Sequence, residues 1–434
     1  MVNGGSHTLR LWPPYPFSAA SAEGPLVRDV DGNVYIDYWQ GHYANILGHN
    51  PRPVLREMSA CLRKGSLHTG FEAQSQIELA ETLARGLGGG DIKVRFTTSG
   101  TLATMYAVML AQGLTGRDLV LKVGGGWHGA SPYLLKGVKH HPGAGFGAPD
   151  SAGLLDDIVR RTIITRFNDG DDLERAIEAH GDRVACFIVE PFLGVGGFLA
   201  ADREYLELAR SLTAGRGILL IFDEIISGYR FCPTGVQTLY GVRPDLTTFG
   251  KIIGGGHAVS AVAGAGAVME ECERARKGRG RVMFEGGTFS GHAEYTRAGQ
   301  VMLTRLASGA KTIYPRIAKA GERLRRAIER VFDEAGIEAR TTGGGNDVVT
   351  GSSLFMVHFP RVKGVAYDRP EDVHDERRSD LRLREETLKL ALLMNGVNIV
   401  HGGGAVSAAH GEREIEATIA AYDEAARLIR KYRD

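Results

Sequence analysis

The chain has 434 residues, of which 43% are hydrophobic and 24% charged, and its formal net charge is +1. This composition is ordinary for a globular enzyme, and the near-neutral charge argues against nucleic acid or an anionic membrane as a partner. No apolar run is long enough to span a bilayer, and the first ten residues contain no apolar signal segment. The four cysteines form no CxxC pair, as is usual in a reducing compartment, so we expect a cytoplasmic protein.

The first fifty residues are irregular in pattern. Three prolines within residues 11–17 exclude a helix there. Residues 26–38 alternate between apolar and polar side chains around Asp31-Gly32, which predicts a β-hairpin. Helical periodicity begins near Pro53 and returns over residues 75–86.

From residue 93 onward the pattern alternates between strand and helix. Strands are predicted at 93–98, 119–123, 184–189, 218–222 and 246–249, and helices at 102–113, 171–180 and 202–214, the last with Asp202 as N-cap. This alternation predicts an α/β fold whose parallel sheet is covered on both faces. After about residue 299, a helical stripe over 317–331, a strand at 353–359 and a striped C-terminal helix over 415–429 predict a smaller α+β domain. The charged run 368–386 is interpreted as a solvated loop or helix face.

One stretch, Gly217 to Gly256, carries the strongest chemical signal. A buried strand in it ends on Asp223, and a shorter strand ends on Gly250-Lys251. Charged residues placed where apolar strands end lie at the carboxyl edge of a parallel sheet, where open α/β folds bind ligands. A partly desolvated lysine there can form a Schiff base with a carbonyl, and a nearby carboxylate can keep a pyridine nitrogen protonated. The pair therefore suggests pyridoxal 5'-phosphate as the cofactor.

Four further motifs follow strand ends and agree with this chemistry. Residues 97–103 (TTSGTLA) open a helix and suit a phosphate group, and residues 286–291 (GGTFSG) form a second such turn. Trp127, within GGGWHG, is a candidate for stacking on a ring or else a core tryptophan, whereas His128 is interpreted as structural. For Glu190 we expect one of two roles: it orients the cofactor, or it forms a salt bridge. We expect no metal site, because no metal-ligand spacing occurs.

In this order the motifs resemble those of the class-III, fold-type I pyridoxal-phosphate aminotransferases, and within them the glutamate-1-semialdehyde 2,1-aminomutase group. The resemblance runs from about Arg28 through the C-terminal helix, and it is carried by SGTLATM, TGRD, WHG, PDSAG, IVEP, LLIFDEIISGYR, PDLTTFGKIIGGG, GTFSG and SAAH. It implies an enzyme with a large domain built on a mainly parallel seven-stranded sheet. It also implies three segments: residues 1–56 covering the active site, 57–300 binding the cofactor, and 301–434 forming the small domain.

The resemblance also implies roles for single residues. Lys251 would hold the cofactor as an internal aldimine, and Asp223 would face its pyridine nitrogen. Ile225 and Trp127 would lie on opposite ring faces. The phosphate would be bound by Gly100 and Thr101 together with Thr288 of a neighbouring subunit in a homodimer, and Glu190 would contribute to the cofactor site.

On the substrate side the sequence departs from the aminomutases in three segments: Gly41-His42-Tyr43, Leu193-Gly194-Val195 and residues 401–406 (HGGGAV). The last lacks the glutamate that, in the aminomutases, helps a bound diamino intermediate react at either amine. Arg10 is the candidate for binding a substrate carboxylate, and His42 is a second candidate substrate residue. We predict amino-group transfer between a small amino donor and a keto or aldehyde acceptor.

Three alternatives stay open. The first is a true aminomutase that makes 5-aminolevulinate. The second is a non-catalytic regulatory protein that keeps the fold, although such a protein would be expected to have lost Lys251 or Asp223. The third is a nucleotide-binding enzyme, which the absence of a Walker pattern disfavours.

Overall fold

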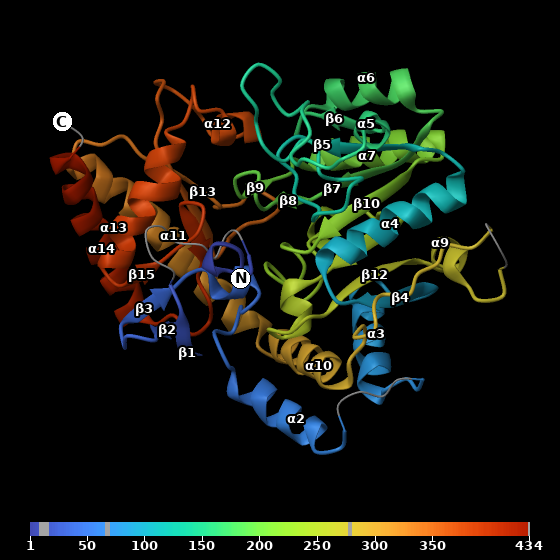
Figure 1. Cartoon of the computed structure of the whole chain (residues 1–434), viewed down its shortest axis with the longest axis horizontal. Coiled ribbons are helices and arrows are strands. Elements are labelled where there is room, and N and C mark those ends of the chain that lie inside the picture. The colour runs from blue at the N-terminus through green and yellow to red at the C-terminus, as the bar shows by residue number, and fades with distance from the viewer. Residues whose placement is uncertain (8–16, 66–69, 277–279, 433–434) are drawn as a thin grey trace.

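The computed structural model describes residues 1–7, 17–65, 70–276 and 280–432. Its centre is a seven-stranded sheet with the order β4-β12-β11-β10-β7-β5-β6 (Figure 1). Only β12 runs antiparallel to its neighbours, so the prediction of an α/β fold with a mainly parallel seven-stranded sheet is confirmed. The strands are β4 (Ile92–Thr97), β5 (Leu119–Val123), β6 (Thr162–Thr165), β7 (Val184–Val189), β10 (Leu219–Glu224), β11 (Leu246–Phe249) and β12 (Ser260–Ala265).

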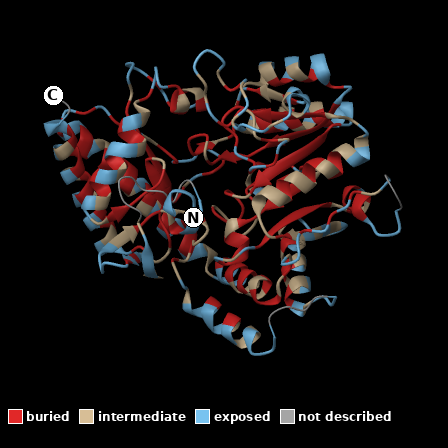
Figure 2. Ribbon diagram, viewed as in Figure 1, coloured by how far each residue is buried: buried red, intermediate tan, exposed pale blue. Residues whose placement is uncertain are grey.

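Helices cover both faces of this sheet, because its strands carry apolar side chains on each side. Val120, Ile188 and Ile221 pack with α4 (Gly100–Thr115) and α9 (Gly266–Met269) on one face. Leu121 and Phe222 point to the other face, which is covered by α6 (Gly170–His180) and α7 (Arg203–Arg216). Figure 2 shows the strands buried between these layers, with exposed residues on the outer sides of the helices.

A second body of structure joins the N-terminal and C-terminal parts of the chain. The predicted hairpin is present as β2 (Leu26–Asp29) and β3 (Val34–Asp37), with β1 (Ala19–Glu23) beside β2 and β15 (Val397–Asn398) parallel to β3. A three-stranded sheet of β13 (Arg340–Thr342), β14 (Leu354–His358) and β16 (Gly403–Ala405) packs against α11 (Ala310–Glu334). The helix α14 (Glu412–Lys431) lies against both α11 and α13 (Leu388–Met394) (Figure 1).

The remaining elements connect these bodies. The helices α2 (Arg52–Leu62) and α3 (Gln74–Gly86) pack on α10 (Ala293–Ser308) near the β4 edge of the large sheet. Short elements complete the chain: α1 (Gln40–Tyr43), α5 (Asp156–Arg160), α8 (Gln237–Tyr240), α12 (Pro370–His374), and the pair β8 (Phe192–Leu193) and β9 (Leu199–Ala200). The division of the chain at residues 56 and 300 stays a prediction.

The charged run 368–386 is not simply solvated, so that interpretation was wrong in part. It contains α12 and a π-helical turn, Leu383–Thr387, and Asp372, Asp375 and Arg384 are buried. Each buried charge has a partner, as such charges require: Arg378, Arg377 and Glu385 respectively. Among the residues described, no helix is both long and apolar enough to cross a membrane.

Candidate active site

Asp223 and Lys251 lie at the same edge of the large sheet, as predicted. The carboxylate of Asp223, near the end of β10, is 2% exposed, and all its recorded partners donate to it. Its Oδ1 accepts from the Thr248 hydroxyl and the Ile225 N–H, both at 3.0 Å. Its Oδ2 lies 2.7 Å from Nδ1 of His128. These hydrogen bonds hold the carboxylate at the strand end in one orientation.

Lys251 follows β11 in a strained backbone conformation, with a φ of 48°. The preceding Gly250 is required because a Cβ there would lie 2.7 Å from Ser260 Oγ and 2.9 Å from Ile225 Cδ1. The Lys251 side chain is surrounded by protein, although the residue keeps part of its surface accessible. It has neither a hydrogen bond nor an ion pair within the part of the chain that the structure describes. Burial lowers the pKa of Lys251 to about 8, against the opposing charges of Asp223 and Glu190.

The N-terminus of α4 supplies the predicted phosphate-type turn. Ser99 caps the helix, its Oγ accepting from the Leu102 N–H at 3.3 Å, and the first turn contains no acidic residue. The free N–H groups and the helix dipole therefore give this end a positive potential. Gly100 lies against Ile225, because a Cβ on it would be 3.1 Å from Ile225 Cδ1. The Thr101 hydroxyl accepts from the Ala130 N–H at 3.2 Å.

Trp127 and Glu190 meet at the next two strand ends. Trp127 is 37% exposed, so it is not a core tryptophan. Its backbone N–H donates to Glu190 Oε1 at 2.9 Å, and Glu190 Oε2 accepts from the Gly194 N–H at 2.9 Å. No ion pair of Glu190 occurs among the described residues, so the salt-bridge alternative is not observed. Burial, and then the charge of Asp223, raise the pKa of Glu190 to about 8.

His128 belongs to this site although the sequence indicated only a structural role. Its side chain is fully buried, and its Nδ1 is bound to a carboxylate 95 residues further along the chain. Because Asp223 is the acceptor, His128 carries its proton on Nδ1. Its Nε2 is buried and has no hydrogen-bond partner in the described structure. Burial lowers the pKa of His128, which favours the neutral imidazole.

The segments expected on the substrate side converge around α1. Four consecutive residues, Gln40 to Tyr43, have φ between 45° and 68°, a left-handed turn that is strained for residues other than glycine. This turn contacts both the Lys251 segment and β16. The Tyr43 ring packs edge-on against Phe198 at 5.4 Å, which joins it to the loop after Glu190. His42 lies 5.0 Å from the Trp39 ring.

A buried arginine fastens this turn to the Asp223 segment. Arg230 is 2% exposed and donates to the carbonyls of Ile226, at 2.8 Å, and Tyr43. Its positive charge also contributes to lowering the pKa of Lys251, after the larger effect of burial. The segment carrying His42 is therefore held at a defined distance from the strand ends.

Two predicted residues are not placed in this constellation. Arg10 lies outside the described residues. Thr288 is exposed, next to an exposed Phe289, in a loop that begins close to Thr98: a Cβ on Gly287 would lie 3.7 Å from its hydroxyl. Within the described chain, no group of three or more His, Cys, Asp or Glu residues is arranged to hold a metal ion.

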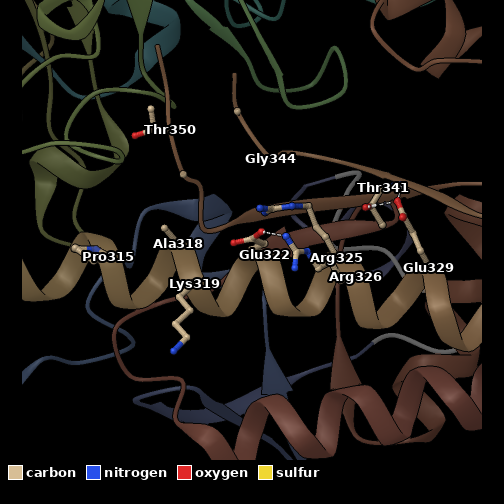
Figure 3. A pocket seen from close by; sticks show the side chains of 12 residues that line it. Pro315, Ala318, Lys319, Glu322, Arg325, Arg326, Glu329, Thr341, Gly344 and Thr350 are labelled. Atoms are coloured by element: carbon tan, nitrogen blue, oxygen red, sulfur yellow. Dashed lines mark hydrogen bonds and ion pairs between the residues drawn. The ribbon is translucent and has the colours of Figure 1, made fainter. Parts of the chain in front are cut away.

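A hollow of about 600 Å³ lies elsewhere, between α11 and the loop 344–351. Figure 3 shows its lining, where Arg326 pairs with Glu322 and Thr341 with Glu329. The Nη1 of Arg325 donates hydrogen bonds to the carbonyls of Ser352 and Leu354. This hollow contains none of the strand-end residues and combines charges of both signs, so the site described above is the better candidate.

Similarity to known proteins identifies the family of this chain. The family model of the class-III aminotransferases matches residues 12–343. The chain belongs to the class-III aminotransferase family. A glutamate-1-semialdehyde 2,1-aminomutase of Methanothermobacter thermautotrophicus is 36% identical over 428 residues, which cover 98% of this chain and 95% of that protein.

Solved structures of similar proteins agree in fold. An omega-transaminase from Sphaerobacter thermophilus is 30% identical with a TM-score of 0.86, covering 99% of this chain and 94% of that one. A transaminase with pyridoxal phosphate bound is 27% identical with a TM-score of 0.85, covering 99% and 95%. The fold is that of the fold-type I transferases, and the protein is a pyridoxal-phosphate-dependent enzyme of amino-group transfer.

The residues of this site fit the cofactor of the family. The α4 N-terminus offers backbone N–H groups suited to a phosphate, and among the described residues the Lys251 amine has no hydrogen-bond or ion-pair partner. Gly100 and Gly250 both pack closely against Ile225, because a Cβ on either glycine would lie within about 3.1 Å of Ile225 Cδ1. The carboxylate that a protonated ring nitrogen requires is that of Asp223, which the buried His128 holds through its Nδ1 at 2.7 Å.

Proposed function

We propose that Lys251 and Asp223 are the catalytic residues of a two-substrate aminotransferase. The observation that carries the proposal is the pair itself. The Lys251 amine has no partner among the residues that the structure describes, and burial lowers its pKa; at the same sheet edge, three donors fix the Asp223 carboxylate. Pyridoxal phosphate, when bound, supplies an aldehyde carbon that takes up amines and a cationic ring that accepts electrons.

Each residue near the pair has a defined task in this proposal. The N–H groups at Gly100 and Thr101 bind the phosphate, together with Thr288 of the partner subunit. Trp127 and Ile225 enclose the ring from its two faces. Glu190 accepts a hydrogen bond from the Trp127 N–H and so positions Trp127 beside the ring.

Asp223 would face the ring nitrogen, and its carboxylate is oriented by the Ile225 N–H and the Thr248 hydroxyl; among the described residues it forms no ion pair with lysine or arginine. The Lys251 amine removes the proton from the substrate α-carbon and returns it later. A pKa of about 8 leaves part of this amine unprotonated at neutral pH, which a general base needs.

The substrate side supports two-substrate transfer over isomerisation. In β16 and the residue before it, added side chains have no space: a Cβ on Gly402 would lie 2.3 Å from Arg384 Cγ, and one on Gly404 2.4 Å from Tyr38 Cβ. No side chain from residues 402–404 can therefore supply the acid expected of an aminomutase in this segment. We further propose that Arg10 binds a substrate carboxylate and that His42 contacts the substrate.

The second candidate is a glutamate-1-semialdehyde 2,1-aminomutase, the activity named for the Methanothermobacter relative. A specific observation favours it: Glu385, in the π-helical turn, is near enough to contribute to raising the pKa of Tyr43 and accepts from His401 at 3.0 Å. It is therefore a carboxylate beside the substrate-side turn. The charge of Arg384 and the His401 contact hold the pKa of Glu385 below its usual range despite burial.

We also propose a homodimer with shared active sites and a cytoplasmic location. The loop carrying Thr288 exposes Phe289 and Met283, large apolar side chains of the kind that a second copy covers. All four cysteines are free thiols, as is usual in a reducing compartment.

A split substrate assay tests these proposals. The purified enzyme with pyridoxal phosphate is offered glutamate-1-semialdehyde alone, and then amino acids each with a keto-acid acceptor. Turnover that requires both an amino donor and an acceptor supports the aminotransferase. Formation of 5-aminolevulinate without an acceptor would instead establish the aminomutase, and Glu385→Gln would then be expected to abolish it.

A further inference from the structure

A second buried lysine lies behind the cofactor site. Lys122 is the fourth of the five residues of β5, is fully buried, and forms no ion pair in the described part of the chain. Its Nζ donates three hydrogen bonds to backbone carbonyls, those of Gly126 at 2.9 Å, Leu134 at 3.2 Å and Lys136 at 2.8 Å. An ammonium has three protons, so its donors are all used. All three carbonyls belong to the loop between β5 and Gly137.

That loop carries the residues that face the cofactor. Trp127 and His128 lie between the first carbonyl and the other two. The loop is pressed against the start of α4, because a Cβ on Gly129 would lie 2.4 Å from Thr101 Oγ1. The His128 carbonyl accepts from the Thr104 hydroxyl at 2.6 Å. The ammonium therefore joins both ends of a loop whose middle forms one wall of the site.

Removing the ammonium would leave three carbonyls without their donor in a dry interior. Buried backbone carbonyls without partners are rare, because the lost hydrogen bond is not replaced by water. The loop would have to move to find other partners, and Trp127 and His128 would move with it. The hydrogen bonds of Lys122 thus determine where Trp127 and His128 lie.

The positive charge of Lys122 also affects the pKa of His128. Burial lowers the pKa of Lys122 to about 8, and Asp150, Glu190 and Asp223 oppose that effect. The pKa of His128 is lowered by burial, raised by Asp223, and lowered again by Lys122. The Lys122 ammonium therefore opposes the rise in the His128 pKa that the Asp223 carboxylate causes.

We propose that Lys122 is a positioning residue of the cofactor site, whose ammonium closes the loop 124–137 and so holds Trp127 and His128 in place. Its positive charge also opposes protonation of His128. The proposal rests on the assignment of Asp223 to the pyridine nitrogen. A neutral His128 donates one proton to Asp223 and leaves the carboxylate its full charge for the ring. A charged imidazolium would share that charge and weaken the interaction with the ring nitrogen.

The chain offers a matched control in the same loop. Lys136 also donates only to carbonyls, those of Val159 at 3.2 Å and Thr162 at 2.8 Å. Its pKa is lowered by burial alone, with no contribution from Asp223 or Glu190. Lys136→Met thus removes a lysine–carbonyl anchor without removing a charge that acts on His128.

The experiment compares Lys122→Met, Lys122→Gln and Lys136→Met with the unchanged enzyme. The titration of His128 is followed by NMR in the cofactor-free protein, with its signal assigned by its loss in His128→Gln. The affinity for pyridoxal phosphate is then measured by titration. For Lys122→Met we expect a changed pKa of His128, because both the charge of Lys122 and the position of the loop change, and cofactor binding weaker by about tenfold or more. Lys122→Gln keeps two hydrogen-bond donors, so it should recover much of the cofactor affinity, but the pKa of His128 should stay higher than in the unchanged enzyme because the charge is lost. Lys136→Met should change neither the affinity nor the pKa of His128.

The proposal would be overturned if His128 titrated as in the unchanged enzyme in both Lys122 variants, or if Lys136→Met caused the same losses. Should Lys122→Met fail to fold, Lys122→Gln decides by the same two readouts. An unchanged enzyme that takes up no pyridoxal phosphate would remove the proposed function instead. The His128 titration is read without cofactor, so the two failures are distinguishable.

Discussion

The lowered pKa of Lys251 makes a prediction about stability that needs no substrate or cofactor. In the unfolded chain a lysine has a pKa near 10.5, whereas in the folded chain burial lowers it to about 8. Below pH 8 both states carry the charged lysine, and the folded chain bears the full cost of burying it. Between pH 8 and 10.5 the folded chain loses the proton first, so stability rises with pH and the cost disappears. Lys251→Met should therefore stabilise the cofactor-free protein at pH 7 but not above pH 10.5.

The size of the effect follows from the two pKa values. A change from 10.5 to about 8 corresponds to about 3 kcal/mol. Because part of the side chain stays accessible to water, we expect about 2 kcal/mol in the free energy of unfolding. Methionine is close to lysine in shape and meets the same backbone strain at a φ of 48°, so neither packing nor strain should reverse the sign.

Urea unfolding of the cofactor-free protein at pH 7 and pH 10.5 measures this difference. Lys311→Met, at an exposed position on α11, is the control and should change stability by less than about 0.5 kcal/mol at either pH. Comparing each variant with the unchanged protein at the same pH removes the effect of other titrating groups. A Lys251→Met variant no more stable than the unchanged protein at pH 7, or a gain independent of pH, would refute the reasoning.

Three further predictions concern the cofactor site. Asp223→Asn should lower the single-turnover rate of amino transfer by about a hundredfold, and a rate within a few-fold of the original would contradict its assignment. Gly129→Ala should weaken pyridoxal-phosphate binding by about tenfold or more, because its Cβ would strike Thr101 at 2.4 Å, whereas Gly143→Ala, with a similar φ but open space, should not. Burial raises the pKa of Glu190 to about 8, so Glu190→Gln should stabilise the cofactor-free protein above pH 8 and lose this advantage as the pH falls toward 4.5; equal effects at both ends would count against a buried neutral acid.

The alternation of strands and helices predicted the central sheet, but not all of it. The run Ser260–Ala265, which forms β12, contains mostly alanine, glycine and serine, so it lacks the bulky apolar residues that mark a strand in sequence. It is a strand because β4 and β11 bind it on both sides and α4 covers it. Tertiary partners, not local propensity, decide its structure.

The candidate site was predicted where its residues end strands, and missed where they depend on long-range contacts. Asp223 and Lys251 could be recognised because each follows an apolar run at a position where parallel strands expose ligands. His128 could not, because its partner is 95 residues away. Lys122 stands in the apolar run LVLKV, and its three carbonyl acceptors are brought to it only by the folded loop.

The central claim, that Lys251 holds the cofactor, is tested most directly by chemical trapping. The enzyme is loaded with pyridoxal phosphate and reduced with borohydride, which links the cofactor permanently to the amine that binds it, and digested peptides are mapped by mass spectrometry. We predict the label on Lys251, and its loss in Lys251→Met together with amino transfer. A label on another lysine, or full transfer by Lys251→Met, would contradict the account.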